Sequence, residues 1–245
     1  MTVSPDILLV GLGTAGARVA YYIYQRGGLP GLRILAMDSG EAAGQVPAAL
    51  TCITLPPPPL LPTPTAKREA NEAIDAILEE HLQNARLVVV VTCLGGATGS
   101  YYTQETLDFA KRKERPAIAF AGMPHATDSE ECKFSAETSL NSLRSQHFQL
   151  IDLNCAELGS LFPDPSPDEA YSQTIRWIAE TALGYLKLFT SPKNSSNSAA
   201  GQNRRTGSLA NLPRGIFTNV PATFFNGENL DLPTYWRNQN HSQLS

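Results

Sequence analysis

The chain has 245 residues, 42% of them hydrophobic and 17% charged, with a formal net charge of −4. This length allows one domain with appendages or at most two small domains, and the acidic balance argues against a nucleic-acid-binding protein. We expect a cytoplasmic protein without a signal peptide, because the four cysteines form no C-x-x-C pair and no apolar run approaches the ~20 residues that cross a bilayer.

Short apolar runs alternate with segments of helical period along the first 190 residues, which predicts an α/β fold with a doubly wound parallel sheet. The run Leu87–Cys93 is apolar almost throughout, as expected of a central strand that is covered on both faces. Six prolines in residues 56–65 exclude a helix there and predict an extended loop. The expected strands are 6–12, 32–38, 50–55, 87–93, 117–123 and 148–153, and the expected helices are 15–25, 66–83, 101–112, 135–146 and one from PSPDEAYSQ to about 189.

The composition changes after this region, so we expect a domain at 1–190, a flexible linker at 191–213 and a tail at 214–245. The linker is polar and rich in small residues. The tail contains five aromatic residues, and residues 194–245 carry four arginines against two acidic residues. Aromatic residues on a tether predict a peptide that docks on a partner, and the alternative is a strap packed on its own domain.

Two glycine-rich turns each follow a predicted strand and open a predicted helix. The first, GLGTAG, fits G-x-G-x-x-G, and Asp38 ends the next strand, where a Rossmann domain carries the acid that binds ribose. Alternatively, the glycines of this turn only let a helix approach a strand. The second, GGATGS, adds two hydroxyls and lacks the lysine of a Walker A loop. Together the turns suggest one phosphate chain held from both sides. The residues predicted to bind it are Gly11, Gly13, Thr14, Ala15, Gly16, Asp38, Gly95, Gly96, Ala97, Thr98, Gly99 and Ser100.

These turns, in this order, resemble the nucleotide-binding domain of the tubulin/FtsZ superfamily. GGATGSY is similar to its Gly-Gly-Gly-Thr-Gly-Thr-Gly signature, GMPHATDSEE to its ribose loop, DLNCAEL to the loop after the next strand, and DEAYSQTIRWIAETALGYLKL to its central helix. The resemblance implies GTP or GDP as the ligand and a ribose contact at Asp128. The four histidines show no ligand spacing with cysteines or carboxylates, so we expect no metal site. GENLDLPTYWRN resembles the FtsZ tail that docks on division proteins. It implies FtsZ, or proteins that bind the FtsZ tail, as partners of Leu230, Asp231, Leu232, Pro233, Tyr235, Trp236 and Arg237.

The chain also departs from the family pattern. The proline-rich segment replaces the loop that senses the γ-phosphate, an acid (Glu130 or Glu131) stands near the family's basic position, and Ile175 and Arg176 stand where guanine is read. Neither side chain can accept hydrogen bonds from the guanine N–H groups, as the residues of the family do.

The acidic loop that activates hydrolysis and the second domain are not found after the central helix, so the chain reads as a truncated, divergent FtsZ-like protein. We therefore expect a non-catalytic pseudo-GTPase that modulates bacterial division filaments. The alternatives are a slow GTPase that needs a full-length FtsZ partner, a filament formed without hydrolysis, and an NAD-dependent oxidoreductase.

Overall fold

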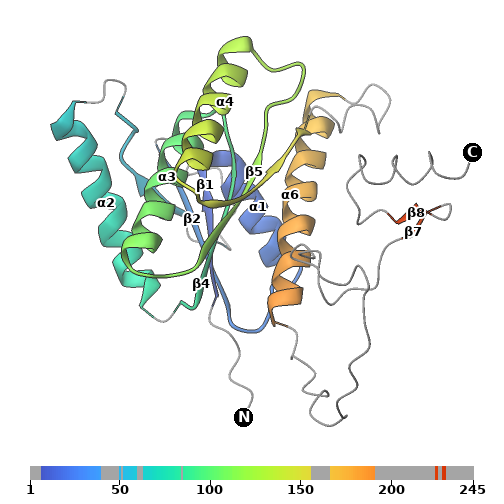
Figure 1. The fold of residues 1–245 in the computed structure, drawn as a ribbon, viewed down its shortest axis with the longest axis horizontal. Helices are drawn as coiled ribbons and strands as arrows, with labels where there is room; N and C mark the ends of the chain where they lie inside the picture. Colours follow the sequence, from blue (N-terminus) through green and yellow to red (C-terminus); the bar gives the residue numbers. More distant parts are fainter. Residues whose placement is uncertain are drawn as a thin grey trace, which may run out of the picture. The chain divides into compact units, whose positions relative to one another are not determined.

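The computed structural model describes residues 7–39, 50, 52–59, 63–83, 85–155 and 166–190, and the short strands 224–225 and 228–229. The chain divides into two compact units, 1–193 and 194–245. The first unit contains a six-stranded, all-parallel sheet in the order β3-β2-β1-β4-β5-β6, which confirms the predicted fold class (Figure 1). Its strands are β1 (Ile7–Leu12), β2 (Leu32–Ser39), β3 (Cys52–Leu55), β4 (Leu87–Cys93), β5 (Ala117–Gly122) and β6 (Gln149–Leu153).

Helices cover both faces of this sheet because successive side chains of a strand point to opposite faces. On β1, Leu9 packs in the apolar cluster of α1 and α6, whereas Leu8 and Val10 pack in the cluster of α2, α3 and α4. Figure 1 shows α1 and α6 on one side of the sheet and the other three helices opposite. The described helices of this unit are α1 (Gly13–Gln25), α2 (Pro64–Leu82), α3 (Ala97–Arg112), α4 (Glu130–Ser145) and α6 (Pro167–Thr190).

The order of the strands reverses direction at β1 and β4, and this point positions the site. The chain passes from β1 outward to β2 and β3, then returns to β4 on the other side and continues to β5 and β6. Leu12 at the end of β1 lies level with Thr92 near the end of β4. The two connections therefore leave the same edge of the sheet side by side, which is where open α/β sheets bind ligands.

Two helices begin four or five residues earlier than the sequence pattern predicts. Helix α3 begins at Ala97 instead of Tyr101, with Gly96 in extended conformation as its N-cap. Helix α4 begins at Glu130 instead of Ser135, because the Ser129 side chain accepts the N–H of Cys132 and thereby caps the first turn. The small residues of GGATGS favour a loop by propensity, so the sequence pattern missed a helical turn that lies at the site.

The second unit contains one described pair of strands. β7 (Phe224–Phe225) pairs antiparallel with β8 (Glu228–Asn229). The predicted linker 191–213 and the predicted partner-binding residues 230–237 lie outside the described residues. Among the helices that the structure describes, none has the length and apolar character needed to cross a bilayer.

Candidate functional site

A cavity of about 350 Å³ opens at the carboxyl edge of the sheet between β1 and β4. Both glycine-rich turns line it, together with the end of β2 and the loop between β5 and α4. The structure thus brings together residues that are more than a hundred positions apart in the chain. The predicted site residues among its lining are Gly13, Thr14, Ala15, Asp38, Gly96, Ala97, Thr98, Gly99 and Asp128.

Four other predicted residues lie behind the cavity and shape its wall. A Cβ atom on Gly11 would lie 2.3 Å from the carbonyl oxygen of Gly16, and one on Gly16 would lie 2.4 Å from that of Val91. These two glycines therefore let α1 approach β1 and β4, which is the alternative that the sequence left open. Gly95 has φ +101° and donates its N–H to the Ser100 hydroxyl at 3.0 Å, so both residues hold the shape of the second turn.

The N-termini of α1 and α3 converge on the cavity. A Cβ on Gly13, which has φ +72°, would lie 3.2 Å from the nitrogen of Gly99, so the two turns are in contact. The first intrahelical hydrogen bond of α3 runs from the N–H of Ser100 to the carbonyl of Gly96. The N–H groups of residues 97–99 precede it and have no acceptor within the helix. Two positive helix ends and a row of N–H donors are suited to holding an anion.

Asp38 ties the end of β2 to both turns. Its side chain is buried; one carboxylate oxygen accepts the Thr14 hydroxyl at 2.8 Å and the other accepts the N–H of Ser39 at 2.8 Å. The Ser39 hydroxyl contacts that of Thr98 in the second turn. Both oxygens of Asp38 thus already accept hydrogen bonds within the protein, which leaves less capacity for the two ribose hydroxyls of a dinucleotide.

The far end of the cavity is lined by residues that the sequence reasoning missed, apart from Asp128. The Asp128 carboxylate accepts the N–H of His125 at 2.7 Å and so closes the β5–α4 loop on itself. His125 Nε2 and the Thr174 hydroxyl share a hydrogen bond at 2.7 Å, and the same hydroxyl lies 3.1 Å from the carbonyl oxygen of Ala170. Tyr171 lies one helical turn before Thr174, and this spacing was the signal that both face the cavity.

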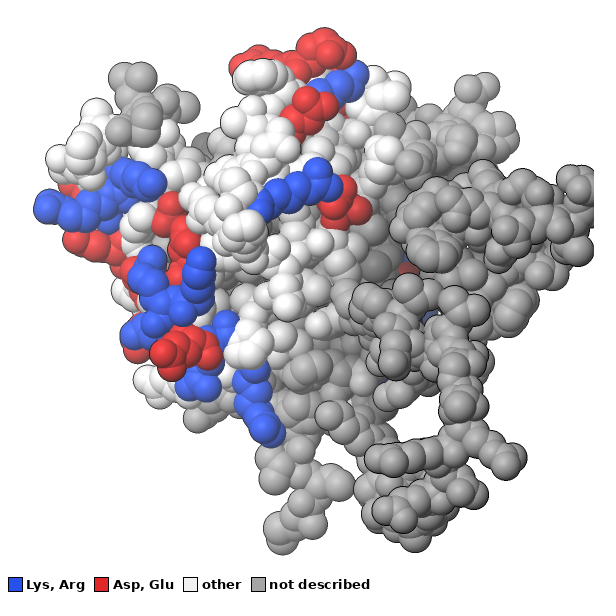
Figure 2. Space-filling model, in the orientation of Figure 1, with Lys and Arg blue, Asp and Glu red and all other residues white. Residues whose placement is uncertain are grey.

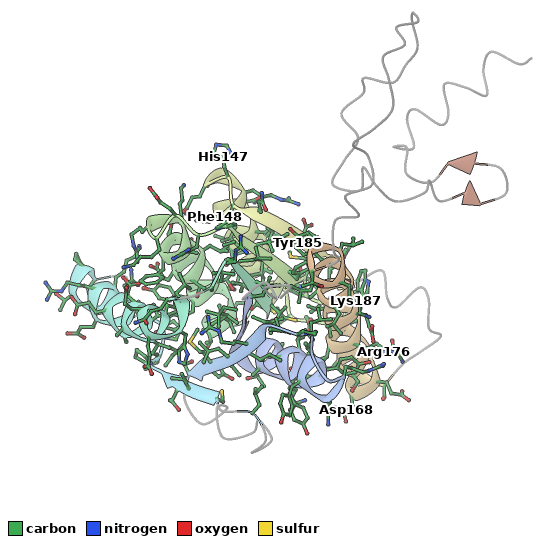
Figure 3. All side chains as sticks on the ribbon, turned by 90° about the horizontal axis from the view of Figure 1, so that it is seen from below. His147, Phe148, Asp168, Arg176, Tyr185 and Lys187 are labelled. Carbon is green, nitrogen blue, oxygen red and sulfur yellow. The ribbon has the colours of Figure 1, made fainter. Side chains whose placement is uncertain are left out.

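The two residues at the predicted guanine positions lie away from the cavity. Ile175 is 7% exposed and packs in the core beneath α6. Arg176 is exposed on the outer side of the helix (Figure 3). Among the described residues that line the cavity there is no lysine or arginine. An anion there would therefore be held by backbone N–H groups, helix dipoles and the hydroxyls of Thr14 and Thr98.

Two thiols also line the cavity. Burial raises the pKa of Cys93 far above that of an ordinary thiol, with smaller contributions from Cys155 and Asp128. Burial likewise raises the pKa of Cys132. Both side chains therefore remain protonated near neutral pH and are poor nucleophiles. Within the described ranges, no group of three or more histidine, cysteine or acidic side chains is arranged to hold a metal ion.

Comparison with known proteins relates this chain to FtsZ in sequence and to FtsZ-like proteins in fold. No family model matches the sequence. The chain is 29% identical over 129 residues to the cell division protein FtsZ of Helicobacter pylori, an alignment that covers 52% of this chain and 33% of that protein. The match thus spans about a third of the length of this curated relative.

Solved structures agree with the sequence match. An FtsZ dimer from M. jannaschii superposes with a TM-score of 0.66 at 18% identity, covering 78% of this chain and 57% of that one. CetZ1 from Haloferax volcanii, solved as a GDP-bound monomer, superposes with a TM-score of 0.59 at 18% identity, covering 78% and 62%. The chain is therefore a divergent homologue of FtsZ by sequence, and its described domain has the fold of the tubulin/FtsZ GTPase domain.

Proposed function

We propose that the cavity binds a guanine nucleotide and that the protein acts without turning it over, as a modulator of the division filament built by FtsZ. The observation that carries the first part is the convergence of two helix N-termini, through Gly13 and Gly99, on one cavity. The solved CetZ1 domain, which has the same fold, binds GDP. The proposed phosphate contacts are the N–H groups of residues 13–15 and 97–99.

The proposal of a non-catalytic role rests on the acids beside the cavity. Asp38 is buried and hydrogen-bonded on both oxygens, so it is poorly placed to activate water. Asp128 uses Oδ2 to accept the N–H of His125, which ties this carboxylate to the β5–α4 loop. Glu130 and Glu131 lie exposed in the first turn of α4 and repel phosphate. Both carboxylates that line the cavity among the described residues are thus tied to groups of the protein itself, which favours an anion cradle over a catalytic centre.

Nucleotide binding is tested by thermal unfolding of the full chain with GTP, GDP, ATP and NAD. A ligand at a hundred times its Kd adds ~2.7 kcal/mol of stability, which raises the Tm by roughly 5–11 °C for a domain of this size. We expect this rise with GTP or GDP. A rise with NAD alone would instead support the oxidoreductase alternative, and no rise with any ligand would remove the nucleotide from the proposal.

The filament role is tested by mixing the protein with FtsZ and measuring sedimentation and phosphate release. We expect less sedimented FtsZ and no phosphate release from the protein alone. Turnover that appears only on mixing, above that of FtsZ, would favour the slow GTPase that borrows its activating loop. A matched variant without residues 230–237 separates binding through the proposed tail motif from binding through the domain. Unchanged FtsZ sedimentation and unchanged binding of tail partners would contradict the role.

A further inference from the structure

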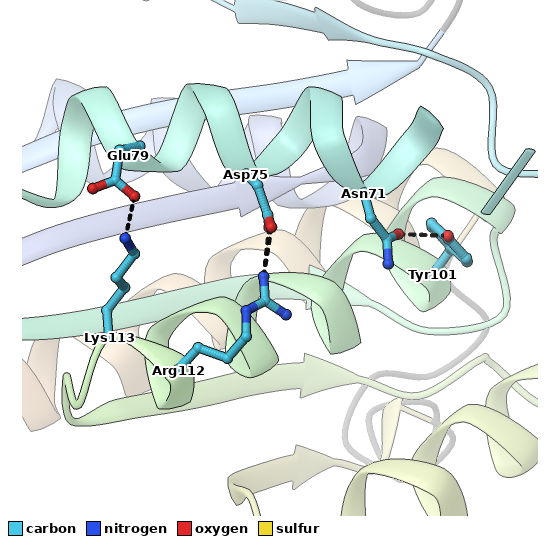
Figure 4. A network of polar contacts seen from close by, with 6 residues as sticks. All are labelled: Asn71, Asp75, Glu79, Tyr101, Arg112 and Lys113. Carbon is cyan, nitrogen blue, oxygen red and sulfur yellow. Dashed lines mark hydrogen bonds and ion pairs between the residues drawn. The ribbon is translucent and has the colours of Figure 1, made fainter. Parts of the chain in front are cut away.

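Helix α2 is held against α3 by a series of polar contacts along the two helices (Figure 4). The Tyr101 hydroxyl donates to Asn71 at 2.8 Å, and the Arg112 guanidinium donates to both oxygens of Asp75 at 2.7 Å. Lys113 pairs with an acid one turn further along α2, Glu79. Figure 2 shows the resulting interleaved charges on the side of the molecule that these helices form.

A second tyrosine anchors the proline-rich segment that precedes α2. Tyr102 is fully buried, and its hydroxyl donates to the carbonyl oxygen of Pro56 at 2.8 Å. Its ring meets that of Tyr101 edge-on, with the centroids 5.0 Å apart. Prolines have no N–H to donate, so this carbonyl is one of the few polar groups through which the segment can be held. The anchor lies three residues beyond Gly99 of the second turn.

The buried tyrosine contributes more to this arrangement than the ion pairs do. The side chains of Arg112 and Asp75 are 51% and 36% exposed, and an ion pair at such a surface adds little stability. Loss of the Tyr102 hydroxyl would leave the carbonyl of Pro56 without this donor. The apolar side of α2, from Ala70 to Leu82, adds core contacts. All these contacts are made by the chain's own atoms, and none of these residues lines the cavity.

We propose that the contacts of Tyr101 and Tyr102 hold α2 and residues 56–59 in one position, whether or not a nucleotide occupies the cavity. This proposal rests on the proposed function, because it concerns whether α2 and residues 56–59 respond when a nucleotide occupies the cavity. Residues 56–59 and α2 thus form a fixed strut that does not respond to phosphate.

Hydrogen exchange of the full chain, without nucleotide and with saturating GDP or GTPγS, tests this proposal. We expect slower exchange at residues 97–102 on binding and unchanged exchange across α2. Exchange in α2 that changes with the nucleotide would overturn the strut. Thermal unfolding of the same samples reports whether the nucleotide binds, so a failure of binding is recognised separately.

The strut itself is tested without nucleotide by the variant Tyr102→Phe. Removing one buried hydrogen bond should accelerate exchange in residues 66–75 roughly fivefold. Asn71→Ala, which removes the other tyrosine contact, should act on the same amides. The control Tyr21→Phe loses a hydroxyl whose hydrogen-bond partner among the described residues is Gln25, on the exposed side of α1, and should leave α2 unchanged. If the amides of α2 exchange at the wild-type rate in both Tyr102→Phe and Asn71→Ala, the proposal of a strut is wrong.

Discussion

At the scale of single residues, the glycines of the two turns divide into those that line the cavity and those that let segments approach. Gly13 and Gly96 line the cavity, whereas Gly11 and Gly16 let α1 approach neighbouring backbone. Gly99 does both, because it lines the cavity and a Cβ there would lie 2.5 Å from the carbonyl oxygen of Cys93. A motif such as G-x-G-x-x-G therefore carries two different requirements. Only its middle glycine faces the place where a ligand would lie.

The packing requirement predicts that Gly16→Ala lowers the stability of the fold. Because the added methyl would lie 2.4 Å from the carbonyl oxygen of Val91, α1 must shift away from β4. Overpacking of this kind costs about 1–3 kcal/mol, which lowers the Tm by several degrees. The control is Gly184→Ala on α6, where nothing lies within 4 Å and alanine favours the helix by about 0.5–1 kcal/mol. Equal melting temperatures of the two variants would contradict this assignment.

At the scale of elements, the pairing of α2 with α3 makes the free energy of unfolding depend on pH in the alkaline range. Burial raises the pKa of both Tyr101 and Tyr102 to about 12, with Glu105 adding to the shift and, for Tyr102, Tyr101 as well. The folded protein therefore keeps protons that the unfolded chain releases near pH 10. This contribution is fully present below about pH 10 and is lost as the pH rises toward 12.

Urea unfolding at a series of pH values from 8 to 11.5 measures this loss. We expect the free energy of unfolding to fall above pH 10, and to fall less steeply in Tyr102→Phe, which has one fewer titrating group. Cys93, whose pKa burial also raises, adds to the fall from about pH 9 in both proteins. Equal slopes in the wild type and the variant would mean that Tyr102 ionises alike in the folded and unfolded chain.

At the scale of the whole molecule, the described apolar core belongs entirely to the first unit. Both core clusters contain only residues between Ile7 and Leu186. We therefore predict that a chain ending at residue 193 unfolds within ~2 °C of the full chain, because less than about 1 kcal/mol is then lost. Differential scanning calorimetry of the two proteins checks this. A clearly lower Tm for the shorter chain would instead favour a tail that packs as a strap on its own domain.

The sequence by itself determined the fold class, and it placed the two glycine-rich turns directly after predicted strands. These follow from local signals: apolar runs such as Leu87–Cys93 define central strands, and glycines after two strands mark turns that parallel topology brings to one edge. Propensity places helix starts poorly, so the first turn of α3 was missed.

Only the tertiary structure decided how the site residues are used. Asp38 is engaged by Thr14, 24 positions away, and His125 by Thr174, 49 positions away. Ile175 faces the core although its neighbour Thr174 faces the cavity. Such roles depend on which segment packs opposite a side chain, and the contacts between segments distant in sequence are set by the packed fold as a whole.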